Sequence, residues 1–191
     1  MKSILFLVEN YYPRMMGVPV VVQYLAEGLL EKGYDVSICT KWYEGLSDKE
    51  NINGIHVYRF RLRKTLMKRY VGEIDSYRKF VLSLNADVVI FECSECVTTD
   101  VLLRNLSQIK GKKIFHSHGF SGMRLLPFKW NVNLKYTLGN TYNWFRFKIY
   151  YSFTLKKYIK QFDETICLSE MDSSKVWLMK NAKKVNVLQN A

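Results

Sequence analysis

The chain has 191 residues, of which 48% are hydrophobic and 24% are charged, a composition typical of a folded domain rather than a disordered one. Only five apolar residues separate Ser3 from Glu9, too few for a signal-peptide core, and no apolar run approaches the roughly 20 residues of a membrane-spanning helix. We therefore expect a cytoplasmic protein that is able to lie on the inner face of a membrane without crossing it. The formal net charge of +12 favours an anionic partner.

Strand and helix signals alternate along the chain. The apolar run at 4–8 predicts a strand, and a polar loop with Pro13 and Gly17 follows it. Next comes an amphipathic helix with Pro19 in its first turn and Gly33 at its end. The remaining signals predict strands at 35–40, 54–60, 87–91, 113–118, 164–169 and 184–188, and helices at 70–84, 97–106, 134–162 and 171–180.

Apolar strands that alternate with helices predict a mostly parallel sheet covered on both faces. We expect a three-layer, Rossmann-like α/β domain with about seven strands. No internal repeat or linker interrupts residues 1–191, so the pattern predicts one domain. In such domains ligands bind where the carboxyl ends of the strands meet, which directs attention to the loops at 10–17, 92–95, 118–119 and 169–170.

His118 ends the fifth predicted strand, next to Gly119. At the ligand edge its imidazole could hydrogen-bond a sugar hydroxyl or carry a proton near neutral pH; the alternative is a satisfied histidine at a strand end. His116 lies on the same side of the strand, and we expect it to be buried. Glu95 and Glu170 are candidate bases, although isolated carboxylates near strand ends are usually caps or solvated.

Gly17 precedes a helix and could let a phosphate approach the N-terminus of that helix. The dinucleotide pattern and the P-loop are both absent, which argues against a nicotinamide enzyme or an ATPase. Cys93 and Cys96 have the spacing of a redox pair, but reduced cytosolic thiols are the favoured interpretation. With three histidines in the chain, we expect no metal site.

Basic residues are concentrated in two stretches. One, at 59–69, contains no acid and holds Arg59, Arg61, Arg63, Lys64, Lys68 and Arg69. The segment from Val101 to Phe162 holds twelve Lys or Arg and no acid, interleaved with many aromatics. The aromatics could equally form core, but lysines and aromatics together suit an anionic membrane surface. The residues predicted to form such a surface are Arg61, Arg63, Lys64, Lys68, Arg69, Arg146, Lys148, Lys156 and Lys157. We expect no nucleic-acid partner, because no DNA- or RNA-binding signature is present.

The order of these signals resembles the N-terminal domain of family 4 glycosyltransferases, enzymes of the two-Rossmann GT-B type. The family's Pro-containing loop that ends in Gly-Gly looks like 13–17, with Met16 in place of the first glycine. Its Gly-His/Tyr-x-Val strand entry looks like 33–36, and its His-Gly strand end looks like 118–119. Its Ser-Glu strand end looks like 169–170, and its hinge entry looks like 189–191, with Ala191 in place of a glycine.

The resemblance implies a retaining enzyme of the hexosyltransferase type. It would transfer a sugar from a nucleotide-sugar to a glycan or lipid-linked acceptor, with no cofactor and no metal. His118 would contact the transferred sugar, and Met16 and Gly17 would lie at the donor phosphates. The acceptor would meet Asn10, Tyr12, Glu95, Gly119, Ser169 and Glu170.

In the family a second Rossmann domain holds the donor and the Glu-x7-Glu motif, and residues 1–191 do not supply them. We therefore expect this chain alone to be inactive. One alternative is a non-catalytic subunit of a split glycosyltransferase that recruits a catalytic partner to the membrane. Another is a basic α/β protein associated with nucleic acid.

Overall fold

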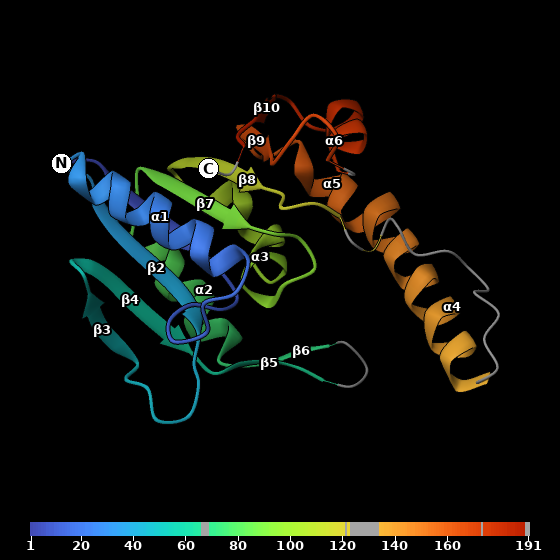
Figure 1. Cartoon of the computed structure of the whole chain (residues 1–191), viewed down its shortest axis with the longest axis horizontal. Coiled ribbons are helices and arrows are strands. Elements are labelled where there is room, and N and C mark those ends of the chain that lie inside the picture. Colours follow the sequence, from blue (N-terminus) through green and yellow to red (C-terminus); the bar gives the residue numbers. More distant parts are fainter. Residues whose placement is uncertain (66–68, 121, 123–133, 173, 190–191) are drawn as a thin grey trace.

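The fold is built on one eight-stranded sheet (Figure 1). The computed structural model describes residues 1–65, 69–120, 122, 134–172 and 174–189. The strand order is β10-β9-β8-β7-β1-β2-β4-β3. The strands are β1 (Ser3–Leu7), β2 (Asp35–Lys41), β3 (Lys49–Ile52), β4 (Ile55–Phe60), β7 (Val88–Glu92), β8 (Lys112–His116), β9 (Glu164–Cys167) and β10 (Val185–Val187).

The seven predicted strands are all present, and neighbours among them pair in parallel. The eighth strand, β3, pairs antiparallel with β4 and was not predicted. Its residues are mostly polar because β3 is an exposed edge strand. Asn53 and Gly54, with φ of 52° and 88°, form the tight turn between the two strands, the usual role of an Asn-Gly pair.

The helices differ from the prediction mainly at their ends. Tyr70–Gly72 forms β6, which pairs with β5 (Leu62–Lys64), so the helix predicted from residue 70 begins four residues later. The helix predicted at 97–106 is two short pieces, an α-helix and a 3-10 helix. The helices are α1 (Val18–Glu31), α2 (Ile74–Ser83), α3 (Val97–Asp100), η1 (Leu103–Gln108), α4 (Leu134–Ile149), η3 (Tyr150–Thr154), α5 (Leu155–Ile159) and α6 (Lys175–Asn181).

Strand β1 separates two apolar layers because its side chains alternate between the faces of the sheet. Ile4 and Phe6 pack with Val22 and Ala26 of α1 on one face. Leu5 and Leu7 pack on the opposite face with α2, α3, η1 and α5. Figure 1 shows α1 in front of the sheet and α2 and α3 behind it. These layers confirm the predicted three-layer Rossmann-like arrangement.

The strand order of the sheet reverses at β1. β2 lies on one side of β1, and β7 lies on the other. The loops that follow β1 and β7 therefore diverge and leave a crevice at the carboxyl edge. Such a switch point is where open α/β sheets bind ligands.

Helices α4 and α5 are joined by one π-helical segment, η3, and together they form the long predicted helix. The wider π turn carries Tyr150 and Tyr151 toward the loop that follows β7, an arrangement frequent at functional sites. Tyr151, Leu155 and Ile159 are buried, whereas α4 extends away from the sheet (Figure 1). Among the described residues, no helix is long and apolar enough to cross a membrane.

Candidate active site

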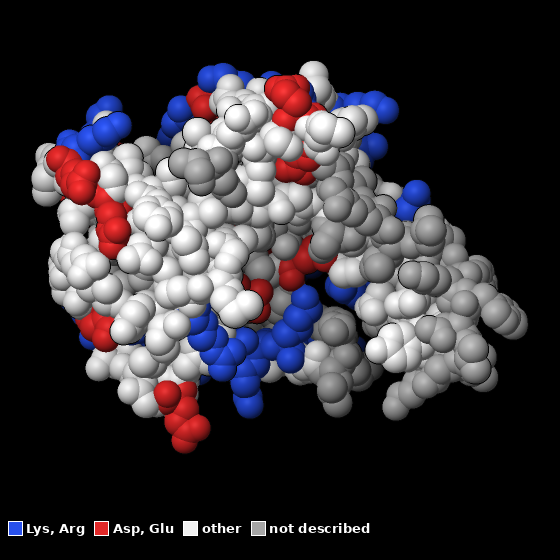
Figure 2. Space-filling model, viewed as in Figure 1, with Lys and Arg blue, Asp and Glu red and all other residues white. Residues whose placement is uncertain are grey.

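A cavity of about 300 Å³ lies at the switch point. Its walls come from the end of β1, the first turn of α1, the loop after β7 and the turn after β8. Polar lining residues include Glu9, Asn10, Glu92, Ser94 and Glu95. Figure 2 shows acidic atoms in the hollow between the sheet and the α4 lobe, with basic atoms gathered over the β5–β6 hairpin at its rim.

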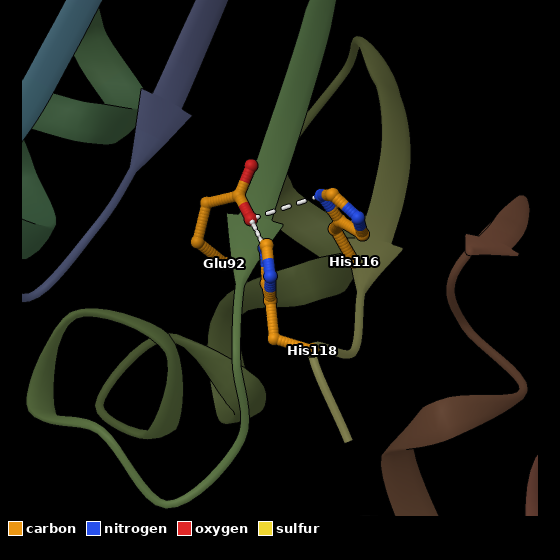
Figure 3. Close-up of side chains that lie close together, drawn as sticks. All are labelled: Glu92, His116 and His118. Carbon is orange, nitrogen blue, oxygen red and sulfur yellow. Dashed lines mark hydrogen bonds and ion pairs between the residues drawn. The ribbon is translucent and has the colours of Figure 1, made fainter. Parts of the chain in front are cut away.

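Glu92 holds two histidines beside this cavity (Figure 3). Its Oε2 lies 2.5 Å from Nε2 of His118 and 3.1 Å from Nδ1 of His116. Burial favours a higher pKa for Glu92, but the hydrogen bonds and charges of the two histidines outweigh it and lower the pKa. The carboxylate is therefore ionised and accepts both bonds, so that both ring nitrogens donate.

The cluster is almost completely buried. Glu92 and His116 are each 1% exposed, and Oε1 of Glu92 and Nε2 of His116 have no hydrogen-bond partner among the described residues. The three ligand atoms lie within 4.8 Å of one another, a spacing that a metal ion could also use. The contacts among the three residues are hydrogen bonds from the two histidines to one carboxylate. The absence of a metal site stays a prediction.

The two loops at the cavity contain unusual backbone conformations. Cys93, Glu95 and His118 have φ of 66°, 63° and 47°, in the left-handed region, and Gly119 follows with 86°. Such conformations cost about 1–3 kcal/mol each for residues other than glycine and concentrate at functional sites. They turn the chain sharply after β7 and β8 and bring both loops against the cavity.

Glu95 is fixed by the π-helical segment. The Tyr151 hydroxyl donates to its Oε1, its backbone N–H donates to the Tyr150 hydroxyl at 3.4 Å, and Lys64 donates to its carbonyl at 3.1 Å. Burial raises the pKa of Glu95 above its usual value, despite the opposing effects of Tyr151 and Arg146. This carboxyl therefore gains a proton more readily than an exposed glutamate.

Asp100 lies next to this group. The hydroxyls of Tyr70 and Tyr150 each donate to it at 2.6 Å. Burial is the main reason that the pKa of Asp100 is raised. Asp100 and Glu95, both with a raised pKa, are thus bonded to the hydroxyls of Tyr150 and Tyr151 respectively. The ring centroids of these two tyrosines are 5.2 Å apart.

The predicted acceptor residues fall into two groups. Asn10, Glu95 and Gly119 line the cavity, and Asn10 also accepts a hydrogen bond from the Tyr43 hydroxyl. The others do not line it. Tyr12 is exposed on the loop after β1, Ser169 is half-buried beyond β9, and Glu170 is exposed and ion-paired with Lys175.

The predicted phosphate loop leads into α1. Gly17 is the N-cap of this helix with φ of 70°. Pro19 has no amide N–H, and the amides of Val20 and Val21 donate to the Gly17 carbonyl, so the first turn offers a ligand few free donors. Val18 and Pro19 line the cavity. Met16 is 88% exposed and is not among the residues that line this cavity.

The cysteines show no redox pairing. Cys93 and Cys96 are free, and the Sγ of Cys96 lies 3.3 Å from the carbonyl oxygen of Glu92. Burial raises the pKa of Cys96 to about 12 and that of Cys93 well above its usual value. Neither thiol is therefore an activated nucleophile.

The basic residues predicted to form one anionic-binding surface lie in different settings. Arg61 pairs with Asp48 at 3.0 Å and with Glu73 at 3.5 Å, acids that are distant in sequence. Lys64 and Arg146 are half-buried near Glu95. Lys68 lies outside the described residues, and the exposed members are Arg63, Arg69, Lys148, Lys156 and Lys157.

Three residues that contribute to the site were not among the predicted site residues: Glu92, Tyr150 and Tyr151. Glu92 ends an apolar strand and pairs in register with His116. An acid that directly follows a buried strand was the available signal. Tyr150 and Tyr151 carried no local signal, because their direction depends on the π-helical turn.

The fold and the switch-point cavity define a Rossmann-like domain with a cavity at its carboxyl edge. The model of the family described as Glycosyltransferase Family 4 matches residues 15–191, so the chain belongs to glycosyltransferase family 4. An uncharacterized glycosyltransferase of Methanocaldococcus jannaschii is 43% identical over 53 residues, which are 27% of this chain and 13% of that protein.

Two solved structures of sucrose-phosphate synthase from Thermosynechococcus elongatus share the fold. The first has a TM-score of 0.64 and 13% identity, and the match covers 99% of this chain and 48% of that one. The second has a TM-score of 0.56 and 14% identity over 100% of this chain and 90% of that one. The chain thus spans about half of the first structure.

Proposed function

We propose that residues 1–191 are the acceptor-side domain of a retaining glycosyltransferase. The sugar would come from a nucleotide-sugar and pass to a glycan or lipid-linked acceptor. The observation that carries this proposal is the cavity at the switch point, lined by Asn10, Glu95 and Gly119 and open to the first turn of α1. Family membership supports the same class of reaction.

The proposed roles follow from position. His118 would contact the transferred sugar, and Met16 and Gly17, at the N-terminus of α1, would lie at the donor phosphates. Glu95 and Asn10 would hydrogen-bond acceptor hydroxyls. Tyr12, Ser169 and Glu170 would take part only through a ligand that extends beyond the cavity.

Sugar binding tests the acceptor site directly. Amide NMR shifts of the chain are followed while simple glycosides are added. We expect shifts at Asn10, Ser94 and Gly119, and weaker binding in Glu95→Gln but not in Glu170→Gln, which removes the same charge outside the cavity. Shifts scattered away from the cavity, or equal binding in the two variants, would contradict the proposal.

The exposed face of α4 supports membrane recruitment as a further element of this function. Leu138, Tyr142, Phe145 and Ile149 are 62%, 55%, 58% and 42% exposed, at the spacing of one helix face. Phe153 continues the face and is 71% exposed. We name these five residues the apolar stripe; the exposed Lys156 and Lys157 follow it in α5, a combination suited to an anionic interface.

Co-sedimentation with vesicles tests this element. The chain should pellet with anionic vesicles at low salt, and Phe145→Ser with Phe153→Ser should release it. Tyr24→Ser removes an exposed aromatic from α1 and should have no effect. A wild-type chain that stays in the supernatant would exclude membrane recruitment.

A non-catalytic subunit that recruits a catalytic partner to the membrane is the second candidate, and the exposed apolar stripe favours it. In that arrangement a separate Rossmann-domain protein would hold the donor. Affinity purification of the tagged chain from its own cells should then capture such a partner. If no such partner is captured, the second candidate is excluded and the acceptor-domain proposal remains.

A further inference from the structure

A second cavity, of about 470 Å³, lies between η1 and the long helix. Tyr70 and Arg104 form one wall, and Arg146, Ile149 and Tyr150 form the other. We call it the arginine groove. It belongs to none of the predicted sites, and only Arg146 was predicted to meet an anion.

The groove carries positive charge from two arginines. Within the described part of the chain, neither Arg104 nor Arg146 forms an ion pair, and the buried Nε of Arg146 has no hydrogen-bond partner. The one acid in the groove, Asp100, is held by the hydroxyls of Tyr70 and Tyr150. Two guanidinium groups with unused donors are suited to a phosphate.

The groove is also continuous with the apolar stripe. Tyr142 and Ile149 belong to both, because they lie on the edge of the helix face that turns toward η1. A ligand whose phosphate sits between the arginines could therefore lay a hydrocarbon chain along the stripe. A free anion would need only the arginine groove. The continuity of the groove with the apolar stripe favours an amphiphile, which would contact both.

The groove and the switch-point cavity lie on two sides of one tyrosine pair. Tyr150 borders the groove and Tyr151 borders the cavity, and their hydroxyls bond Asp100 and Glu95 respectively. A ligand that occupies the groove therefore lies next to the side chains that border the cavity.

We propose that the arginine groove binds the phosphate of an amphiphilic acceptor. This inference rests on the proposed function, since it assigns a chemical class to the acceptor. The apolar chain lies on the stripe, the phosphate lies between Arg104 and Arg146, and the sugar or polyol head reaches the cavity.

Binding of a short-chain lipid below its micelle concentration tests the inference. Dihexanoyl phosphatidic acid supplies the phosphate and the chains, dihexanoyl phosphatidylcholine supplies the same chains with a zwitterionic head, and inorganic phosphate supplies the anion alone. Calorimetry should show that phosphatidic acid binds more tightly than either. In Arg104→Gln with Arg146→Gln its affinity should fall at least about tenfold, the effect of losing one charge-assisted hydrogen bond.

Lys32→Gln with Lys180→Gln removes two exposed charges outside the groove and should leave the affinity unchanged. Equal weakening in both double variants, or none in either, would overturn the inference. Binding of inorganic phosphate as tight as that of the lipid would make the groove a free-phosphate site instead. Circular dichroism verifies folding, and glycoside-induced NMR shifts at the cavity show independently whether the acceptor site itself stands.

Discussion

At the scale of single residues, the central feature is a buried carboxylate shared by two histidines. Ionised Glu92 accepts a hydrogen bond from Nε2 of His118, so the proton of that bond is held on Nε2 and not on Nδ1. The protein thereby fixes the tautomer and the direction of the proposed catalytic histidine. Positioning of this kind matters because hydrogen-bonding groups act best when they are preorganised.

Replacement of Glu92 by Gln should weaken this arrangement, because a neutral amide oxygen is a weaker acceptor than the carboxylate oxygen that both histidines share. We expect the free energy of unfolding to fall by about 2 kcal/mol, the range for hydrogen bonds to charged groups. Urea unfolding measures the loss, and ¹⁵N NMR should show mixed tautomers for His118. Glu170→Gln is the matched control and should change the stability by less than about 0.5 kcal/mol.

Asp100 shows the opposite electrostatic behaviour. Its pKa is raised from 3.8 by burial, so the folded state binds its proton more tightly than the unfolded state does. This group therefore contributes stability at low pH that is lost as the pH rises through the folded pKa. Glu92, with its lowered pKa, contributes stability above about pH 4.5 that is lost on acidification.

Tyr150→Phe should raise the pKa of Asp100 further, because the Tyr150 hydroxyl is the strongest of the groups that lower it. A ¹³C NMR titration of the Asp100 carboxyl measures the shift. Tyr158→Phe alters the same helix at a hydroxyl with no hydrogen bond among the described residues, and should leave the titration unchanged. A lower pKa in Tyr150→Phe would contradict the proposed network.

At the scale of elements, two glycines differ in whether a larger side chain could replace them. Gly72 ends β6 with φ of 108°, and an added Cβ would lie 1.9 Å from the carbonyl oxygen of Arg61. Gly139 lies inside α4, where an added Cβ meets nothing within 4 Å. The first position needs glycine for both conformation and space, and the second does not.

Alanine at these two positions should therefore act in opposite directions. Gly72→Ala should destabilise the fold by at least about 2 kcal/mol through strain and a backbone clash. Gly139→Ala should stabilise it by up to about 1 kcal/mol, because alanine is the better helix former. Chemical denaturation measures the free energy of unfolding of both variants. Similar free energies for the two would show that the β5–β6 hairpin contributes little to stability.

At the scale of the whole molecule, the candidate site is a cavity at the surface of one α/β domain. The cavity is open at the carboxyl edge, and a glycosyltransferase has to exclude water and align donor with acceptor, which supplies much of the rate enhancement. We therefore expect no measurable transfer by the isolated 191 residues from any nucleotide sugar. A coupled assay for nucleotide release measures this, and steady turnover by the purified chain would refute it.

The sequence by itself determined the alternating strands and helices, the ligand edge and the candidate His118-Gly119 turn. These features depend on local periodicity and on the left-handed conformations that glycine adopts, and both are visible in a single chain. The polar edge strand β3 escaped prediction because its residues lack the apolar alternation of a buried strand.

Only the tertiary structure decided which of the candidate residues share a site. Glu92 meets His116 because β7 and β8 pair in that register, and Tyr151 reaches Glu95 because of one π-helical turn. The acids that pair with Arg61 come from separate segments, so an acid-free stretch of sequence did not remain acid-free in space. Such contacts depend on long-range packing, which residue order alone does not specify.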